Sequence, residues 1–115
     1  MEVFMNVYDT VNKLAQEIKD SDEFKNYKKY KELVKSDAET SEQIKKFETL
    51  RYEIQISAMQ GMETNKEKES ELQEIYTQLL SKENVKEYFD SEFKFNILLA
   101  DVNKIIGDSV KEVLG

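Results

Sequence analysis

Few side chains in this sequence have the chemistry of a catalytic or metal-binding group. The 115 residues contain no cysteine and no histidine. Thiolate nucleophiles, iron–sulfur clusters, the usual zinc and di-iron sites and histidine acid–base catalysis are therefore excluded for this chain. A paired-carboxylate hydrolase needs two acids in one apolar cleft, and Glu92 is the one acid that falls among apolar residues. We therefore expect no catalytic residue and no enzyme.

Four glutamates near the middle of the chain could in principle gather a cation: Glu67, Glu69, Glu71 and Glu74. At helical spacing they spread around the helix instead of converging, and hard cations are usually held by a shaped loop. The sequence therefore predicts no metal site and no cofactor.

Two polar groups fall on apolar helix faces and could form a buried pair. Arg51, the only arginine, lies in an apolar stripe, and Glu92 lies with Asn96 and Asn103 on the apolar side of the last helix. A guanidinium is the best partner for a buried carboxylate, so we predict an Arg51–Glu92 pair within or between subunits. Asn103 could fix helix register. The alternative is that these groups reach solvent at an edge.

The segment KNYKKYK interleaves Lys25, Lys28, Lys29 and Lys31 with two tyrosines. Such a patch could hold single-stranded RNA by charge and stacking. Tyr27 and Tyr30 share the inward spacing of their helix, however, so the interpretation we favour makes them core residues with the lysines as a solvated face.

The elements that carry these residues are helices. There is no proline and there are only three glycines, which is typical of long helices. Apolar periodicity predicts five helices in a single domain spanning residues 1–115, at about 7–19, 22–34, 37–60, 65–80 and 85–114. The fold class is all-α, a bundle with a long antiparallel hairpin and the last helix at its centre.

Cap residues predict where the helices begin and end. Ser21 fits an N-cap, and Gly61 fits the residue that ends a helix. Thr64 and Glu67 have capping-box spacing. The stretch 57–72 is then the tip of the hairpin, sealed by Met59 and Met62. The polar residues 65–71 are a solvated helix end or a docking surface.

More apolar helix surface is present than one chain can bury. The helix over 37–60 has a second apolar stripe, and the middle of the last helix is apolar almost all round. Such surfaces suggest a second subunit, so we predict a homo-oligomer. The candidate interface residues are Tyr52, Ile56, Met59, Met62, Phe93 and Leu99.

Charge and hydropathy indicate which partners and which cellular compartment to expect. The net charge of −7 disfavours nucleic acid and anionic membranes. The apolar run 97–100 is too short to cross a bilayer, and MEVFMNVYD lacks the basic start of a signal peptide. We expect a cytoplasmic protein.

Four segments in order resemble one family: VYDTVNKLAQEIKDSDEFKNYKKYKELVKSDAE, IKKFETLR, MQGME and DVNKII. They are similar to the YheA-like branch of the YlbF/YmcA family. The resemblance implies an all-helical, oligomeric protein. It also implies a regulatory adaptor of the kind that influences ribonuclease-dependent mRNA processing and, through it, competence, biofilm formation and sporulation. Better-known branches bind an iron–sulfur cluster through cysteines, and because this chain has none, that role is not carried over.

The sequence therefore predicts a non-enzymatic cytoplasmic interaction module that binds its own copies or other proteins. An RNA-associated accessory protein that uses the lysine patch is the alternative.

Overall fold

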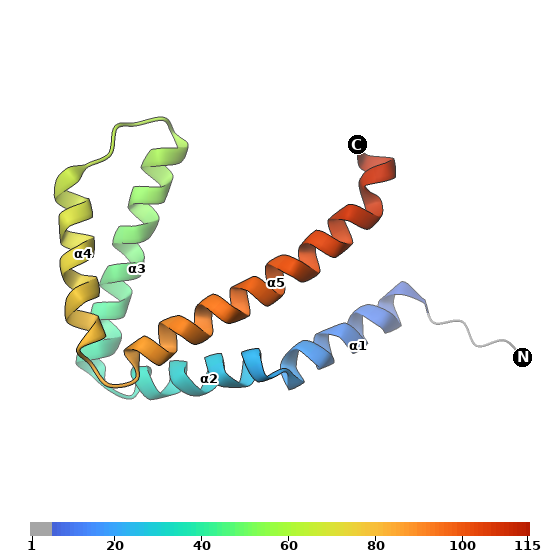
Figure 1. Ribbon diagram of the computed structural model, residues 1–115, viewed down its shortest axis with the longest axis horizontal. Coiled ribbons are helices and arrows are strands. Elements are labelled where there is room, and N and C mark those ends of the chain that lie inside the picture. Colours follow the sequence, from blue (N-terminus) through green and yellow to red (C-terminus); the bar gives the residue numbers. More distant parts are fainter. Residues whose placement is uncertain (1–5) are drawn as a thin grey trace, which may run out of the picture. The chain divides into compact units, whose positions relative to one another are not determined.

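The computed structural model describes residues 6–115, so most of the acidic N-terminal segment lies outside the described residues. Five α-helices and no strand are found over this range, which confirms the predicted all-α class. The helices are α1 (Val7–Asp20), α2 (Asp22–Lys35), α3 (Ala38–Met59), α4 (Lys66–Leu80) and α5 (Val85–Leu114) (Figure 1). Each bound lies within one residue of its expected position.

The chain divides into two compact units, and each is described by itself. Residues 30–89 form the hairpin unit, and the described residues 6–29 and 90–115 form the terminal unit. Helices α2 and α5 contribute to both. The organisation as a single domain stays a prediction.

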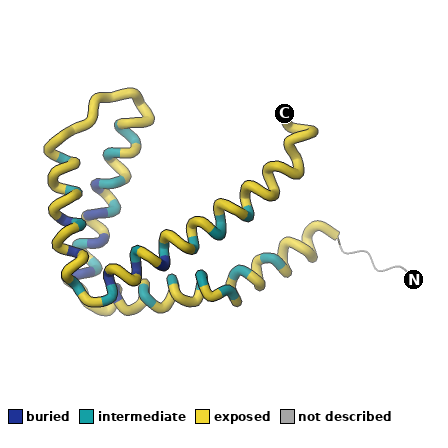
Figure 2. Tube along the Cα trace, in the orientation of Figure 1, coloured by how far each residue is buried: buried dark blue, intermediate teal, exposed yellow. Residues whose placement is uncertain are grey.

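In the hairpin unit, α3 and α4 lie side by side as the predicted antiparallel hairpin (Figure 1). Their facing stripes recur every three or four residues, as helix packing requires. An aromatic cluster lies at the base, where the Phe47 ring centroid is 5.8 Å from that of Tyr76 and 5.5 Å from that of Phe89. The buried apolar side chains of this unit are Val34, Ile44, Phe47, Leu50, Ile75, Leu79, Val85 and Tyr88 (Figure 2).

The end of α3 is a Schellman motif, as Gly61 predicts. Gly61 has φ of +73°, a left-handed conformation that costs other residues free energy. The amide of Met62 donates to the Ser57 carbonyl at 3.0 Å, and the amide of Gly61 donates to the Ala58 carbonyl at 3.1 Å. Two carbonyls at the helix end are thereby satisfied, and the chain reverses toward α4.

The start of α4 corrects the predicted cap, and the start of α3 carries a buried side-chain hydrogen bond. Asn65, and not Thr64, caps α4: its side-chain oxygen accepts from the amides of Glu67 and Lys68 at 3.0 and 3.2 Å. Asp37 lies at the N-cap position of α3, and its carboxylate accepts a 2.7 Å hydrogen bond from the hydroxyl of buried Thr40. This hydrogen bond is the main cause that lowers the pKa of Asp37.

In the terminal unit, Ser21 separates α1 from α2 and caps the second helix, accepting a hydrogen bond from the Phe24 amide at 3.2 Å. The rings of Phe24 and Tyr27 both pack on Phe95 of α5, with centroids 5.9 and 5.6 Å away. These contacts join the start of α2 to α5 at long sequence separation.

The middle of α5, which was predicted to carry more apolar surface than one chain can bury, is partly exposed in the single chain. Phe93 exposes 67% of its surface and Ile97 exposes 45%, and every residue from 103 to 115 is exposed (Figure 2). The helix is continuous through Gly107. Too few helices accompany α5 in the terminal unit to surround it.

Candidate interaction surfaces

The predicted second stripe of α3 is exposed. Tyr52 and Met59 expose 64% and 82% of their surface and Met62 exposes 61%, whereas Ile56 is half-buried. At 100° per residue, the stripe lies about 120° to 180° around α3 from Phe47, on the side away from the core. We call Tyr52, Ile56, Met59 and Met62 the hairpin surface. Its role as an oligomer interface stays a prediction, as do the roles of exposed Phe93 and half-buried Leu99.

The sealing role predicted for the two methionines is wrong for Met59, which is largely exposed. Met62 lies over a hollow of about 120 Å³ between the end of α3 and the start of α4. Ile54 and Ala58 form its apolar wall, and Asn65 and Lys68 line the polar side. Met62 is thus one of the residues that line the tip, although it is 61% exposed, and Met59 is 82% exposed.

The polar first turns of α4 form ion pairs with α3. Lys68 lies 3.4 Å from Glu53, and Lys46 lies 3.7 Å from Glu71, all at partly exposed positions. Exposed pairs of this kind contribute about 0–1 kcal/mol each. They favour the interpretation of residues 65–71 as a solvated helix end.

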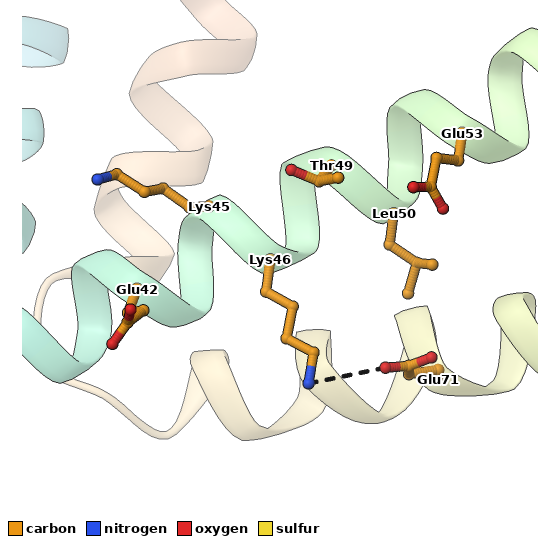
Figure 3. A pocket seen from close by; sticks show the side chains of 7 residues that line it. All are labelled: Glu42, Lys45, Lys46, Thr49, Leu50, Glu53 and Glu71. Atoms are coloured by element: carbon orange, nitrogen blue, oxygen red, sulfur yellow. Dashed lines mark ion pairs between the residues drawn. The ribbon is translucent and has the colours of Figure 1, made fainter.

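A second hollow of the hairpin unit, about 410 Å³, opens widely to solvent along α3. Figure 3 shows Leu50 pointing between the helices and Lys46 reaching toward Glu71 of α4. Apart from Leu50 and Thr49, its lining is charged: Glu42, Lys45, Lys46, Glu53 and Glu71. Small-molecule sites are usually more enclosed and more apolar, so the hollow does not define a ligand.

Arg51 and Glu92 each have a defined contact within their own unit. The Arg51 guanidinium carbon lies 5.3 Å from the centroid of the Phe47 ring, a cation–π arrangement. The Tyr27 hydroxyl donates to the Glu92 carboxylate at 3.4 Å. The Arg51–Glu92 pair stays a prediction, and so does the register role of Asn103, whose side chain is exposed.

The lysines of the proposed RNA patch, Lys25, Lys28, Lys29 and Lys31, are exposed, whereas Tyr27 and Tyr30 are half-buried. A stacking platform needs an open ring face. The Tyr27 ring packs on Phe95 and its hydroxyl bonds to Glu92, which favours the core interpretation of that tyrosine. No observation favours RNA, and the alternative stays a prediction.

Within residues 6–115, no three acidic side chains cluster in a way that could hold a metal ion. Over the same range, no helix combines the length and the apolar run that a membrane crossing requires.

The fold and these surfaces define a small all-α protein with a two-helix hairpin and exposed apolar stripes. The family model described as "Control of competence regulator ComK, YlbF/YmcA" matches residues 7–111. The chain therefore belongs to the YlbF/YmcA family, as the sequence motifs indicated. This is a regulatory family and not a known enzyme family. Assignment to the YheA-like branch stays a prediction.

Relatives match over nearly the whole chain. A UPF0342 protein from Desulfitobacterium hafniense is 34% identical, covering 96% of this chain and 89% of its own. A UPF0342 protein from Caldicellulosiruptor bescii is 31% identical over 92% and 89%. A solved structure, a protein of unknown function (DUF964) from Bacillus stearothermophilus, matches with a TM-score of 0.76 at 18% identity. It covers 93% of this chain and 94% of its own, and it supports the fold alone.

Proposed function

We propose that this chain is a non-enzymatic, cytoplasmic protein-interaction module. Its role is that of a regulatory adaptor, similar to the YlbF/YmcA proteins that influence ribonuclease-dependent mRNA processing. Membership of a family described by control of a competence regulator supports the regulatory part. The hairpin surface supports the part that concerns binding.

The exposure of Tyr52, Met59 and Met62 on a well-packed hairpin is the observation that carries the proposal. A stable core on one side of α3 fixes the backbone, so these side chains are not needed to hold the hairpin together. Large apolar residues that project together from a helix are typical of a binding surface. Tyrosine and methionine are enriched at interfaces, and methionine adapts to the shape of its partner.

The test compares proteins captured from native cells by three tagged versions of the full chain. The first is the wild type, and the second is Tyr52→Lys with Met59→Lys. The control is Ser70→Lys with Thr77→Lys on α4, which adds the same charge at the same seven-residue spacing on exposed positions. The cells also carry untagged chain, so that a second copy counts as a captured protein.

We expect a defined set of proteins to be captured by the wild type and the control and lost with the Tyr52/Met59 variant. Circular dichroism should show equal helicity in all three, because every substituted side chain is exposed. Capture of the same set by all three versions would remove the hairpin surface as a binding site. Unchanged processing of ribonuclease-dependent transcripts in cells that lack the chain would exclude the proposed role in mRNA processing.

A further inference from the structure

The tip of the hairpin unit carries sulfur chemistry that a binding surface does not need. The sequence has four methionines and no cysteine. Within residues 6–115 there are two methionines, Met59 and Met62, and both belong to the hairpin surface. Peroxides oxidise the sulfur atoms of cysteine and methionine. Because cysteine is absent, oxidation by a peroxide is directed, within residues 6–115, to the hairpin surface.

Both thioethers are open to a small oxidant. Met59 exposes 82% of its surface and Met62 exposes 61%. Every residue from 58 to 67 is exposed (Figure 2). Hydrogen peroxide is uncharged, so the net charge of −7 does not repel it. Access to the sulfur atoms therefore permits oxidation at both positions.

The surroundings of the two methionines set an order of reactivity. Met62 lines the hollow of about 120 Å³, whose apolar wall is formed by Ile54 and Ala58. Part of its side chain is thus turned toward protein and away from solvent. Met59 is the last residue of α3 and is the more exposed of the two. We therefore expect Met59 to react before Met62.

Oxidation at these positions leaves the hairpin folded. The turn is held by backbone hydrogen bonds, among them the 3.0 Å bond from the Met62 amide to the Ser57 carbonyl. Both methionine side chains lie outside the buried core of the hairpin unit. A sulfoxide in a core disrupts packing, whereas a sulfoxide at the tip changes only the chemistry of the surface.

We propose that Met59 and Met62 form a reversible oxidation site, and that their oxidation by hydroperoxides releases the proteins bound to the hairpin surface. In each step an S–O bond forms at the Sδ atom, the O–O bond breaks, and the peroxide leaves as water or an alcohol. The sulfur is oxidised by two electrons and the peroxide is reduced by two.

The reverse step is the reaction of methionine sulfoxide reductases, one enzyme for each sulfoxide epimer. Two thiols are oxidised to a disulfide, and the sulfoxide oxygen leaves as water. The inference rests on the proposed function, because it concerns the regulation of the same surface.

The sulfoxides change the surface from apolar to polar at two of its four residues. A thioether is a weak acceptor, whereas a sulfoxide oxygen is strongly polar and needs a hydrogen-bond donor. An acceptor that is buried in an apolar contact without a donor weakens binding roughly tenfold. The two sulfoxides together should therefore lower the affinity for a bound protein roughly 100-fold.

The first measurement is the reaction of the full chain with hydrogen peroxide beside N-acetylmethionine, followed by digestion and mass spectrometry. We expect Met59 to react at nearly the rate of N-acetylmethionine, Met62 to follow, and the two reductases to remove both oxygens. Circular dichroism should show equal helicity before and after oxidation. Thioethers that survive at both positions once N-acetylmethionine is converted would overturn the proposal, as would sulfoxides that the reductases leave in place.

The second measurement is capture from native cells by tagged chain that is treated with peroxide and freed of it before mixing. The oxidised wild type should lose its captured proteins and regain them after reduction. The control is Met59→Leu with Met62→Leu, which removes both sulfur atoms from the hairpin surface. Compared only with itself, this variant should keep after peroxide whatever it captures before. Equal loss in the variant and the wild type would overturn the proposal.

Partial oxidation of the wild type gives a test that needs no substitution, and it decides if the leucine variant captures nothing untreated. Partly oxidised chain is mixed with cell extract, and bound and free chains are separated by size. Mass spectrometry should find sulfoxide at Met59 and Met62 depleted in the bound chains. Sulfoxide at Met5, which is not part of the hairpin surface, should be equal in both fractions. Equal distribution at all three positions would contradict the proposal.

The outcomes separate this inference from the proposed function. If Tyr52→Lys with Met59→Lys loses the captured proteins while the oxidised wild type retains them, the oxidation site alone is overturned. If the untreated wild type captures nothing that this variant loses, the proposed function fails, and the inference fails with it.

Discussion

The turn at Gly61 allows the hairpin geometry to be tested through the sign of one free-energy change. Gly61→Ala places a Cβ on a residue with φ of +73°. That Cβ would meet nothing within 4 Å, so steric contact with neighbours adds nothing. The cost is the left-handed backbone itself, about 1–2 kcal/mol for an L-residue with a side chain. We expect a loss of unfolding free energy of this size.

Gly107→Ala is the matched control with the opposite sign. Gly107 lies inside α5, its φ is not in the left-handed region, and an added Cβ again meets nothing within 4 Å. Alanine in a helix interior should then increase the unfolding free energy by roughly 0.5–1 kcal/mol, because glycine loses more entropy on folding. The two substitutions are chemically identical and should differ in unfolding free energy by roughly 1.5–3 kcal/mol.

Urea unfolding at one fixed protein concentration, followed by circular dichroism, measures both changes. The slope of free energy against urea should be unchanged, so that the midpoints carry the difference. Gly61→Asn should fall between glycine and alanine, since asparagine tolerates the left-handed region better. A Gly61→Ala variant as stable as the wild type would refute the Schellman turn and the placement of Met59 and Met62 that follows from it.

Three further predictions concern other single features. Asn65→Ala should lower the unfolding free energy by about 1 kcal/mol through loss of the α4 cap, whereas Thr64→Ala should leave the urea midpoint unchanged. Thr40→Val removes the hydroxyl that holds the pKa of Asp37 below its ordinary value of 3.8. A carboxyl pKa that is lowered in the folded state stabilises the fold at pH values above the unfolded pKa, so the variant should be less stable than the wild type at neutral pH. Unfolding measured at several pH values should show the stability difference between variant and wild type vanishing as the pH falls below 3.8. In filter-binding assays, wild type and a variant with the lysines of 25–31 neutralised should retain single-stranded RNA equally poorly. Wild-type binding that falls steeply with salt concentration and is abolished in the variant would instead support the RNA alternative.

The sequence predicted the helices well because their signals are local. Apolar spacing and the absence of proline located all five helices, and Gly61 marked the end of α3 for a physical reason that the structure confirms. The error at the start of α4 was also local. Thr64 had a glutamate at capping-box spacing, but Asn65 is an equally good cap one residue later, and its side chain reaches two amides.

The surfaces were harder to predict because periodicity shows that a helix face is apolar without showing what covers it. The stripe of Tyr52 and Met59 was identified as surplus because α3 has a second stripe for its core. Val7, Val11 and Leu14 recur at helical spacing in α1, and nothing in that spacing separates them. Only the folded chain shows that Leu14 is half-buried whereas Val11 and Val7 are exposed.

Arg51 shows which contacts of a polar group spacing can predict. The guanidinium lies over the ring of Phe47, four residues earlier on the same helix, and spacing on one helix could have suggested this contact. A pair with Glu92 depends on tertiary structure that spacing does not encode, and it stays a prediction.

The side chains of the hairpin surface suit partners of more than one shape. The surface presents two methionines and a tyrosine, and flexible thioethers repack against partners of different shape. Valine is branched at Cβ and stiff, so it fits fewer shapes. Replacing Met59 by valine should therefore narrow the set of proteins that the tagged chain captures, whereas the helicity of the variant should equal that of the wild type because position 59 is exposed.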